Sequence, residues 1–230
     1  MNTIRFMCLA VGVLAVASAR LSADSITDLF DTGVGNNGVS LPDGTSPDPH
    51  YMIVANTDGS VSSTTTIKTS ASGFPVSSGW WNGDSATSAW IVPSAGYPGN
   101  ASPSIYMPVG YYDYLTTFTL PSDANSVSIS LNLAADDEAP GILLNGFLVD
   151  TPPYPTVNFY NYTPISFASD AVVAGINMLT FETYNIEPSP TGLRVDGITG
   201  TYTVVPEPSA FALFGIAMLG IFGYRKRNKA

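Results

Sequence analysis

Short stretches of alternating apolar and polar residues recur along the chain, and Pro, Gly, Ser, Thr and Asn separate them. Such alternation places every second side chain on one face of a β-strand. The clearest stretch is residues 126–134, and residues 112–120 alternate in the same way. The apolar positions of the first stretch are Val127, Ile129, Leu131 and Leu133. Because no stretch between the two terminal segments sustains a helical period, the pattern predicts an all-β fold there.

Turn signals divide the rest of the chain into further strands. Asn145-Gly146 lies between two apolar runs and predicts a hairpin, because both residues of a type I′ turn need positive φ. Later strands are expected at residues 177–184 and 193–205, with Gly197 and Gly200 as bulge or bend positions. In the first half, strands are expected at 26–31, 50–55 and 90–92, with an edge strand at 64–68 inside a Ser/Thr-rich loop over 57–79.

About nine strands with connections of Greek-key length suit one jelly-roll-type β-sandwich over residues 24–204. This length can bury a core without disulfide support. The single cysteine, Cys8, lies close to the N-terminus, so neither a disulfide nor thiol chemistry is expected in the sandwich. The architecture expected is therefore one domain between two short terminal segments.

The first segment, residues 1–23, has the pattern of a signal peptide. Arg5 precedes an apolar run over residues 6–16, and Ala17-Ser18-Ala19 is a small-residue cleavage site. Cleavage is expected after Ala19, with Ala23 as the second choice. The alternative, a retained membrane anchor, needs roughly 20 apolar residues, and this run is shorter.

The last segment, residues 205–230, has three parts. Pro206-Glu207-Pro208 ends the preceding strand, since proline cannot continue a hydrogen-bonded ladder. An apolar stretch then predicts a transmembrane helix at about 209–224, short for a bilayer but helped by snorkelling of the basic residues that follow. Those residues, Arg225, Lys226 and Arg227, are expected to stay cytoplasmic.

These three parts at the end of a chain that begins with a signal peptide resemble a PEP-CTERM sorting signal. The resemblance implies recognition by an exosortase-type membrane transpeptidase and removal of the tail. It also implies a membrane-anchored precursor exported across the inner membrane, and delivery to the surface or biofilm matrix of an exopolysaccharide-producing cell. The alternatives are an ordinary tail anchor and a C-terminal helix packed in a core.

The charge of the expected sandwich narrows the range of partners. Only two basic residues, Lys68 and Arg194, stand against seventeen acidic ones between Asp24 and Val205, which gives a formal charge of −15. Such a domain repels phosphate backbones and anionic lipid, so nucleic-acid binding is not expected. Neutral polymers such as exopolysaccharide, cations and basic surfaces remain as partners.

Several motifs in the second half look like the turns of a galactose-binding-like sandwich module. They are Ala134-Ala135-Asp136-Asp137-Glu138, Leu144-Asn145-Gly146, Gly175-Ile176-Asn177 and Pro190-Thr191-Gly192-Leu193-Arg194-Val195. Many members of that fold class bind sugars, although a fold alone does not establish a ligand.

Two sets of residues are candidates for binding. Asp136, Asp137 and Glu138 form an acidic turn that could hold a structural calcium ion; the alternative is a solvated turn. Aromatic residues on loops could stack on sugar rings, or could instead cover the ends of the sandwich. The carbohydrate candidates are Trp80, Trp81, Tyr97 and Tyr154, with Tyr111, Tyr160 and Tyr162 as further loop aromatics, whereas Trp90 is expected in the core. No other cofactor is expected.

No catalytic set can be assembled with the only histidine, His50, so a non-catalytic structural or exopolysaccharide-associated module is the preferred interpretation. A polysaccharide hydrolase that pairs Glu182 with Asp136 or Glu138 is one alternative. A protein-binding adhesive module, which needs an exposed apolar patch, is another. The glycine-rich run 33–38 lacks the lysine and following helix of a phosphate-binding loop.

Overall fold

The computed structural model describes residues 23–42, 46–56, 65–69, 73–93, 107–152 and 157–204. The predicted signal peptide and sorting tail lie outside these ranges, apart from Ala23. Residues 22–205 form one compact unit, to which all the described residues belong. Because this unit has its own hydrophobic core, it can fold as an independent domain.

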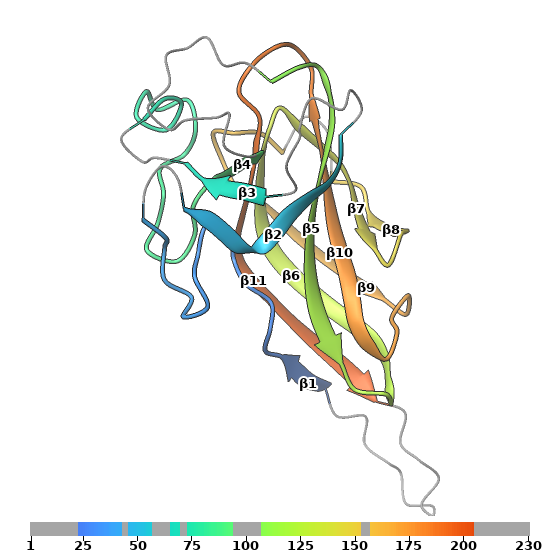
Figure 1. Ribbon diagram of the computed structural model, residues 1–230. Coiled ribbons are helices and arrows are strands. Elements are labelled where there is room, and N and C mark those ends of the chain that lie inside the picture. Colours follow the sequence, from blue (N-terminus) through green and yellow to red (C-terminus); the bar gives the residue numbers. More distant parts are fainter. Residues whose placement is uncertain are drawn as a thin grey trace, which may run out of the picture. The chain divides into compact units, whose positions relative to one another are not determined.

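Eleven strands are formed by the described residues of this unit (Figure 1). They are β1 (Ala23–Ile26), β2 (Pro47–Asn56), β3 (Thr65–Lys68), β4 (Ile91–Pro93), β5 (Gly110–Leu120), β6 (Ala124–Asp136), β7 (Glu138–Leu144), β8 (Phe147–Asp150), β9 (Thr163–Ser169), β10 (Gly175–Asn185) and β11 (Gly192–Val204). No helix occurs among the described residues, so the all-β prediction is confirmed.

The strands form a continuous antiparallel sheet that folds over into two layers. Its order is β8-β7-β10-β5-β2-β3-β4-β11-β6-β9, with β1 paired to β11. One layer holds β8, β7, β10, β5 and β2; the other holds β1, β11, β6 and β9. The short strands β3 and β4 connect the layers. The architecture is the β-sandwich expected from the sequence.

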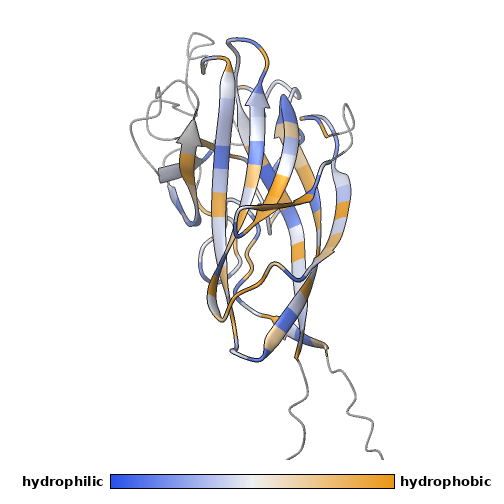
Figure 2. Ribbon diagram, turned by 90° about the vertical axis from the view of Figure 1, so that its right-hand side faces the viewer, coloured by the Kyte–Doolittle hydropathy of each residue, from blue (hydrophilic) through white to orange (hydrophobic). Residues whose placement is uncertain are grey.

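Alternation along the long strands creates the core between the layers. In β6, Val127, Ile129, Leu131 and Leu133 are all buried, whereas the serines between them are more exposed. Figure 2 shows the same change of hydropathy from residue to residue along the other long strands. The opposite layer contributes the aromatic residues Tyr112, Tyr114, Phe118 and Phe181. One continuous apolar cluster therefore holds the layers together.

The long strands and the hairpin lie where the sequence predicts them. Asn145 and Gly146 have φ of 51° and 82°, as the hairpin turn between β7 and β8 requires. The register of β11 against β6 shifts between Asp196 and Thr199, which confirms a bulge at Gly197. Gly200 instead lies in close contact with Leu29 and Ile26, where a Cβ would meet their side chains within 3 Å.

Three sequence predictions differ from the structure. The strand expected at 26–31 is wrong beyond Ile26, because residues 27–34 leave the ladder and cross the edge of β11. The strand at 65–68 is not at an edge, since β3 pairs with both β2 and β4. Strand β9 was not predicted; it pairs with β6 through residues far along the chain.

We expect Gly33 to be more sensitive to substitution than Gly38, although both have φ near 70°. A Cβ at Gly33 would lie 2.7 Å from the Ala89 Cβ, whereas a Cβ at Gly38 meets nothing within 4 Å. Gly38→Ala should cost about 1 kcal/mol for the left-handed backbone alone. Gly33→Ala should cost roughly 1–3 kcal/mol more for overpacking. Urea unfolding of both variants measures the difference, and equal losses would contradict the close contact.

Candidate functional site

A long loop, residues 73–90, covers the outer face of β6 and β11 at the end where β11 begins. Trp81 and Trp90 of this loop stack at 4.3 Å between ring centroids, and each is at most 1% exposed. They form a second apolar cluster with Ala134, which lies on the outer face of β6. Trp90 is thus fully buried, as predicted, although in this second cluster and not between the layers. The loop turns part of a solvent-facing sheet surface into a buried one.

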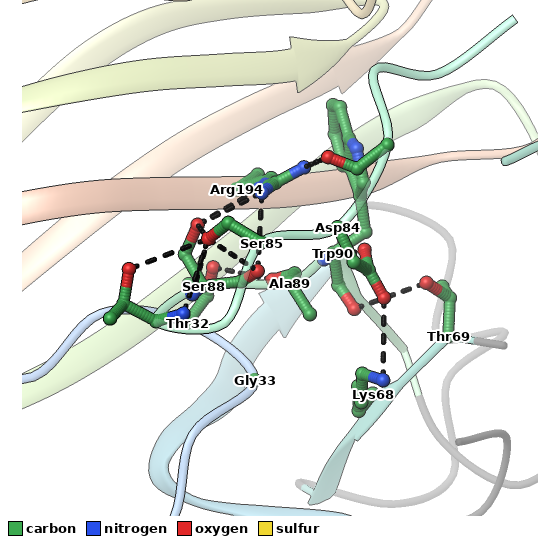
Figure 3. Close-up of polar contacts among 12 residues, drawn as sticks. Thr32, Gly33, Lys68, Thr69, Asp84, Ser85, Ser88, Ala89, Trp90 and Arg194 are labelled. Atoms are coloured by element: carbon green, nitrogen blue, oxygen red, sulfur yellow. Dashed lines mark hydrogen bonds and ion pairs between the residues drawn. The ribbon is translucent and has the colours of Figure 1, made fainter. Parts of the chain in front are cut away.

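Arg194 of β11 fastens this loop to the sheet (Figure 3). Its side chain is 1% exposed and makes hydrogen bonds to both ends of the segment 82–88. Nη1 donates to the carbonyl oxygens of Asn82, at 3.2 Å, and Gly83, and Nη2 donates to the carbonyl oxygen of Ser88 at 3.1 Å. The guanidinium also lies over the ring of Tyr162, 5.2 Å from its centroid. One side chain therefore positions two loops.

The charge of Arg194 has acidic neighbours. Ser88 donates from its hydroxyl to Asp196 at 2.6 Å and accepts from the Arg194 Nε at 3.2 Å, so it links the two. Asp84 forms a buried ion pair with Lys68 at 3.3 Å. Burial raises the pKa of Asp84, and the charges of Lys68 and Arg194 oppose that rise. Both basic residues of the sandwich thus hold the loop in place.

The structure brings two exposed aromatic residues to this end of the sandwich. Trp80 is 53% exposed and packs edge-on against Phe74, with 5.2 Å between centroids. Tyr160 is 57% exposed and lies against Phe159, at 4.3 Å. The two loops meet where the Asn82 N–H donates to the Phe159 carbonyl oxygen at 3.0 Å. We call this surface, Trp80 and Tyr160 on their joined loops, the aromatic end.

The other predicted carbohydrate contacts do not belong to the described part of this surface. Trp81 is buried, and its Nε1 donates to the Asp136 carboxyl at 2.7 Å. Tyr97 and Tyr154 lie outside the described residues. Tyr111 packs against Tyr184 on the outer face of the other layer, with 4.7 Å between centroids.

The acidic turn after β6 has a different arrangement from a metal-binding turn. Asp136 is buried against Trp81, while Asp137 accepts the Ile186 N–H at 2.8 Å and Glu138 begins β7. Within the described ranges, no group of three or more His, Cys, Asp or Glu side chains is arranged to hold a metal ion.

Asp136 is a proton-holding carboxyl group. Burial, above all, and the neighbouring carboxylate of Asp137 raise the pKa of Asp136 to about 9, although the hydrogen bond from Trp81 opposes this. At neutral pH the protonated Asp136 can donate to Asp137 and accept from Trp81. This raised pKa favours the neutral form of the carboxyl group at the contact between Asp136 and the loop.

Glu182, the acid considered for hydrolysis, is paired with neither Asp136 nor Glu138 in the sheet. It lies directly opposite Asp113 of β5 and next to Gly141 of β7, where a Cβ would clash with its carboxylate. Burial and the charge of Glu182 raise the pKa of Asp113 to about 6.

Exposed apolar residues of the same layer, such as Met52 and Met178, lie on strands β2 and β10.

Comparison with protein families places a PEP-CTERM protein-sorting motif at residues 204–227. The match includes Pro206, Glu207, Pro208 and the basic residues Arg225, Lys226 and Arg227. This motif implies an exported, exosortase-sorted surface protein, as the sequence analysis expected. No helix able to cross a bilayer occurs in the described part of the chain, and the predicted span at 209–224 lies outside it.

Two solved structures similar to the sandwich are family 35 carbohydrate-binding modules. The module from an environmental isolate is 11% identical, with a TM-score of 0.29, and covers 45% of this chain and 84% of its own. The module from Clostridium thermocellum is 14% identical, with a TM-score of 0.26, and the match covers 44% of this chain and 83% of that module. No curated protein matches the sequence.

We expect Asp136→Asn to flatten the dependence of stability on pH. The folded protein keeps a proton that the unfolded chain releases above about pH 4, so stability should fall as pH rises from there toward about 9. Asparagine retains an acceptor for Trp81 and a donor to Asp137, but it does not titrate. Urea unfolding across this range should show a smaller loss for Asp136→Asn than for the unsubstituted protein. Asp123→Asn, at an exposed turn, is the matched control, and an unchanged slope in Asp136→Asn would contradict the assignment.

Proposed function

We propose that this chain is an exported surface or extracellular-matrix protein whose sandwich is a non-catalytic module that contacts exopolysaccharide. An exosortase-type transpeptidase removes its tail after the apolar segment has held the precursor in the membrane. The observation that carries the proposal is that the sorting motif and the aromatic end lie at opposite ends of one strand, β11. The sorting motif begins at residue 204, where β11 ends, whereas the aromatic end lies where β11 begins.

The separation of these features follows from the length of β11. Thirteen residues of extended strand span about 40 Å. Trp81 reaches Gly192 at the first residue of β11, and a Cβ there would lie 2.7 Å from its ring. A protein attached through the C-terminal end of β11 would therefore present Trp80 and Tyr160 away from the attachment point.

The chemistry of the aromatic end suits a neutral polymer. The apolar C–H faces of a sugar ring can pack on exposed aromatic faces, and the polar rim of the loops supplies hydrogen bonds. The formal charge of −15 between residues 24 and 204, from two basic and seventeen acidic residues, disfavours anionic ligands.

A second candidate function, binding to another protein, is favoured by the apolar side chains on the opposite layer. Met52, Val54, Ile176 and Met178 are each at least 46% exposed on β2 and β10. Exposed apolar residues that gather on one sheet are typical of protein contacts. We place this function second because the carboxylates of Asp113 and Glu182 lie within the same layer.

We expect Trp80→Ala to weaken retention of residues 22–205 by neutral polysaccharides in affinity electrophoresis. The lost ring contact should cost about 1–2 kcal/mol, or roughly 5- to 30-fold in affinity. Phe147→Ala is the matched control, because Phe147 is an exposed aromatic residue on β8. Retention that is absent for the unsubstituted domain, or equally weakened by Phe147→Ala, would overturn the role of the aromatic end.

We expect replacement of Pro206, Glu207 and Pro208 by alanine to block processing of the full chain in an exporting cell. The uncut precursor should accumulate with its tail attached, and mass spectrometry of the C-terminal peptide measures this. Ser209→Ala, directly after the motif, is the control and should be processed normally. Normal loss of the tail from the triple variant would sink the sorting assignment.

A further inference from the structure

A pocket of about 470 Å³ lies where residues 27–38 cross the edge of β11, and the functional proposal above does not use it. Its walls come from three parts of the chain: the segment after β1, Ile198 of the β11 bulge, and Thr87 of the long loop. The side chains that matter for binding are Leu29, Phe30, Asp31, Asn36, Asn37 and Thr87. The volume falls in the range of about 300–1,000 Å³ usual for small-molecule sites.

Hydrogen bonds hold these walls in fixed positions. The Thr32 hydroxyl donates to the Ala89 carbonyl oxygen at 2.7 Å and accepts the Val195 N–H at 3.0 Å. The Ala89 N–H returns to the Thr32 carbonyl oxygen at 2.8 Å, and Ser40 donates to Ala86 at 3.1 Å. The pocket is therefore preorganised, which lowers the entropic cost of binding.

The polar groups of the pocket include one carboxylate and two amides. Asp31 accepts the Ile198 N–H at 2.8 Å, which orients its carboxyl group at the bulge. Burial raises the pKa of Asp31, and the backbone N–H groups of Ile198 and Gly197 oppose that rise. Asn37 accepts the Val39 N–H at 3.1 Å through its oxygen, and no acceptor for its NH₂ group is found among the described residues, so that group can donate to a ligand.

The apolar wall is fixed as well. The Phe30 ring stacks on His50, with 3.7 Å between centroids and 6° between planes. Leu29, Val34 and Ile198 extend this wall. The pocket thus combines an apolar side with hydrogen-bonding groups of both kinds.

We infer that this pocket binds a single neutral sugar residue, with Asp31 and the Asn36 and Asn37 amides on its hydroxyl groups. A calcium ion is the weaker fit, because it needs six to eight oxygen ligands and the described residues of the lining include a single carboxylate, Asp31. An anionic ligand would meet Asp31 in an acidic domain. The inference rests on the proposed function only for the class of ligand, since the pocket is separate from Trp80 and Tyr160.

The test is a backbone-amide NMR titration of residues 22–205 with free glucose, galactose, mannose and glucuronate. We expect at least one neutral hexose to shift the amides of residues 35–38 and Ile198, and glucuronate to leave them unchanged. Asp31→Asn should weaken this binding about tenfold or more, because hydroxyl bonds to a carboxylate are stronger than those to an amide. Thr87→Trp, which fills the pocket from its rim, should abolish it.

Asp123→Asn is the matched control for charge, and Thr117→Trp is the control for a large side chain at an exposed position. The inference fails if no neutral hexose shifts these amides, or if the shifts survive both Asp31→Asn and Thr87→Trp. Failure of the pocket with Trp80-dependent retention of polysaccharide intact would leave the proposed function standing. Pocket shifts without Trp80-dependent retention of polysaccharide would support the sugar pocket and overturn the role of the aromatic end.

Discussion

The aromatic end of this sandwich depends on the hydrogen bonds that the buried side chain of Arg194 makes to the long loop. A guanidinium group is costly to remove from water unless its N–H groups find acceptors. Here the acceptors are the carbonyl oxygens of Asn82, Gly83 and Ser88, so the cost is offset only when the loop is in place. Trp80 belongs to the loop that this side chain fixes, and Thr87, at the rim of the pocket, belongs to the same segment. A change at Arg194 therefore reaches both surfaces at once.

Strand β11 connects the long loop, the pocket and the sorting motif. Its first residues lie under the long loop, its bulge forms one wall of the pocket, and its last residue begins the sorting motif. An acidic domain with only two basic residues places one of them, Arg194, on this strand, and the other, Lys68, reaches the same loop through Asp84. Both basic residues of this domain therefore hold the same irregular segment, the loop 73–90, in place.

Local patterns were sufficient to predict the long strands. The alternation in β5 and β6 and the Asn145-Gly146 turn depend on neighbouring residues, and these predictions are confirmed. The arrangement of the site depends instead on contacts between distant residues. Trp80 and Trp81 are adjacent in sequence, but only Trp81 finds Asp136, 55 positions away, and is buried. Likewise, Asp113 and Glu182 meet only through the pairing of β5 with β10, which no local pattern specifies. The scarcity of Lys68 and Arg194 was the one available sign that both are paired and buried.

The pairing of β1 with β11 has a mechanical consequence. Ala23 lies opposite Thr203, so the two ends of the domain leave it side by side. If the protein is held through residue 205 while a polymer pulls on the far loops, tension runs along β11. Sheet hydrogen bonds lie across the strand direction, so those to β6 and β1 would be loaded together in shear and would not open one at a time. The fold would then resist a steady drag on the cell surface with many bonds acting in parallel.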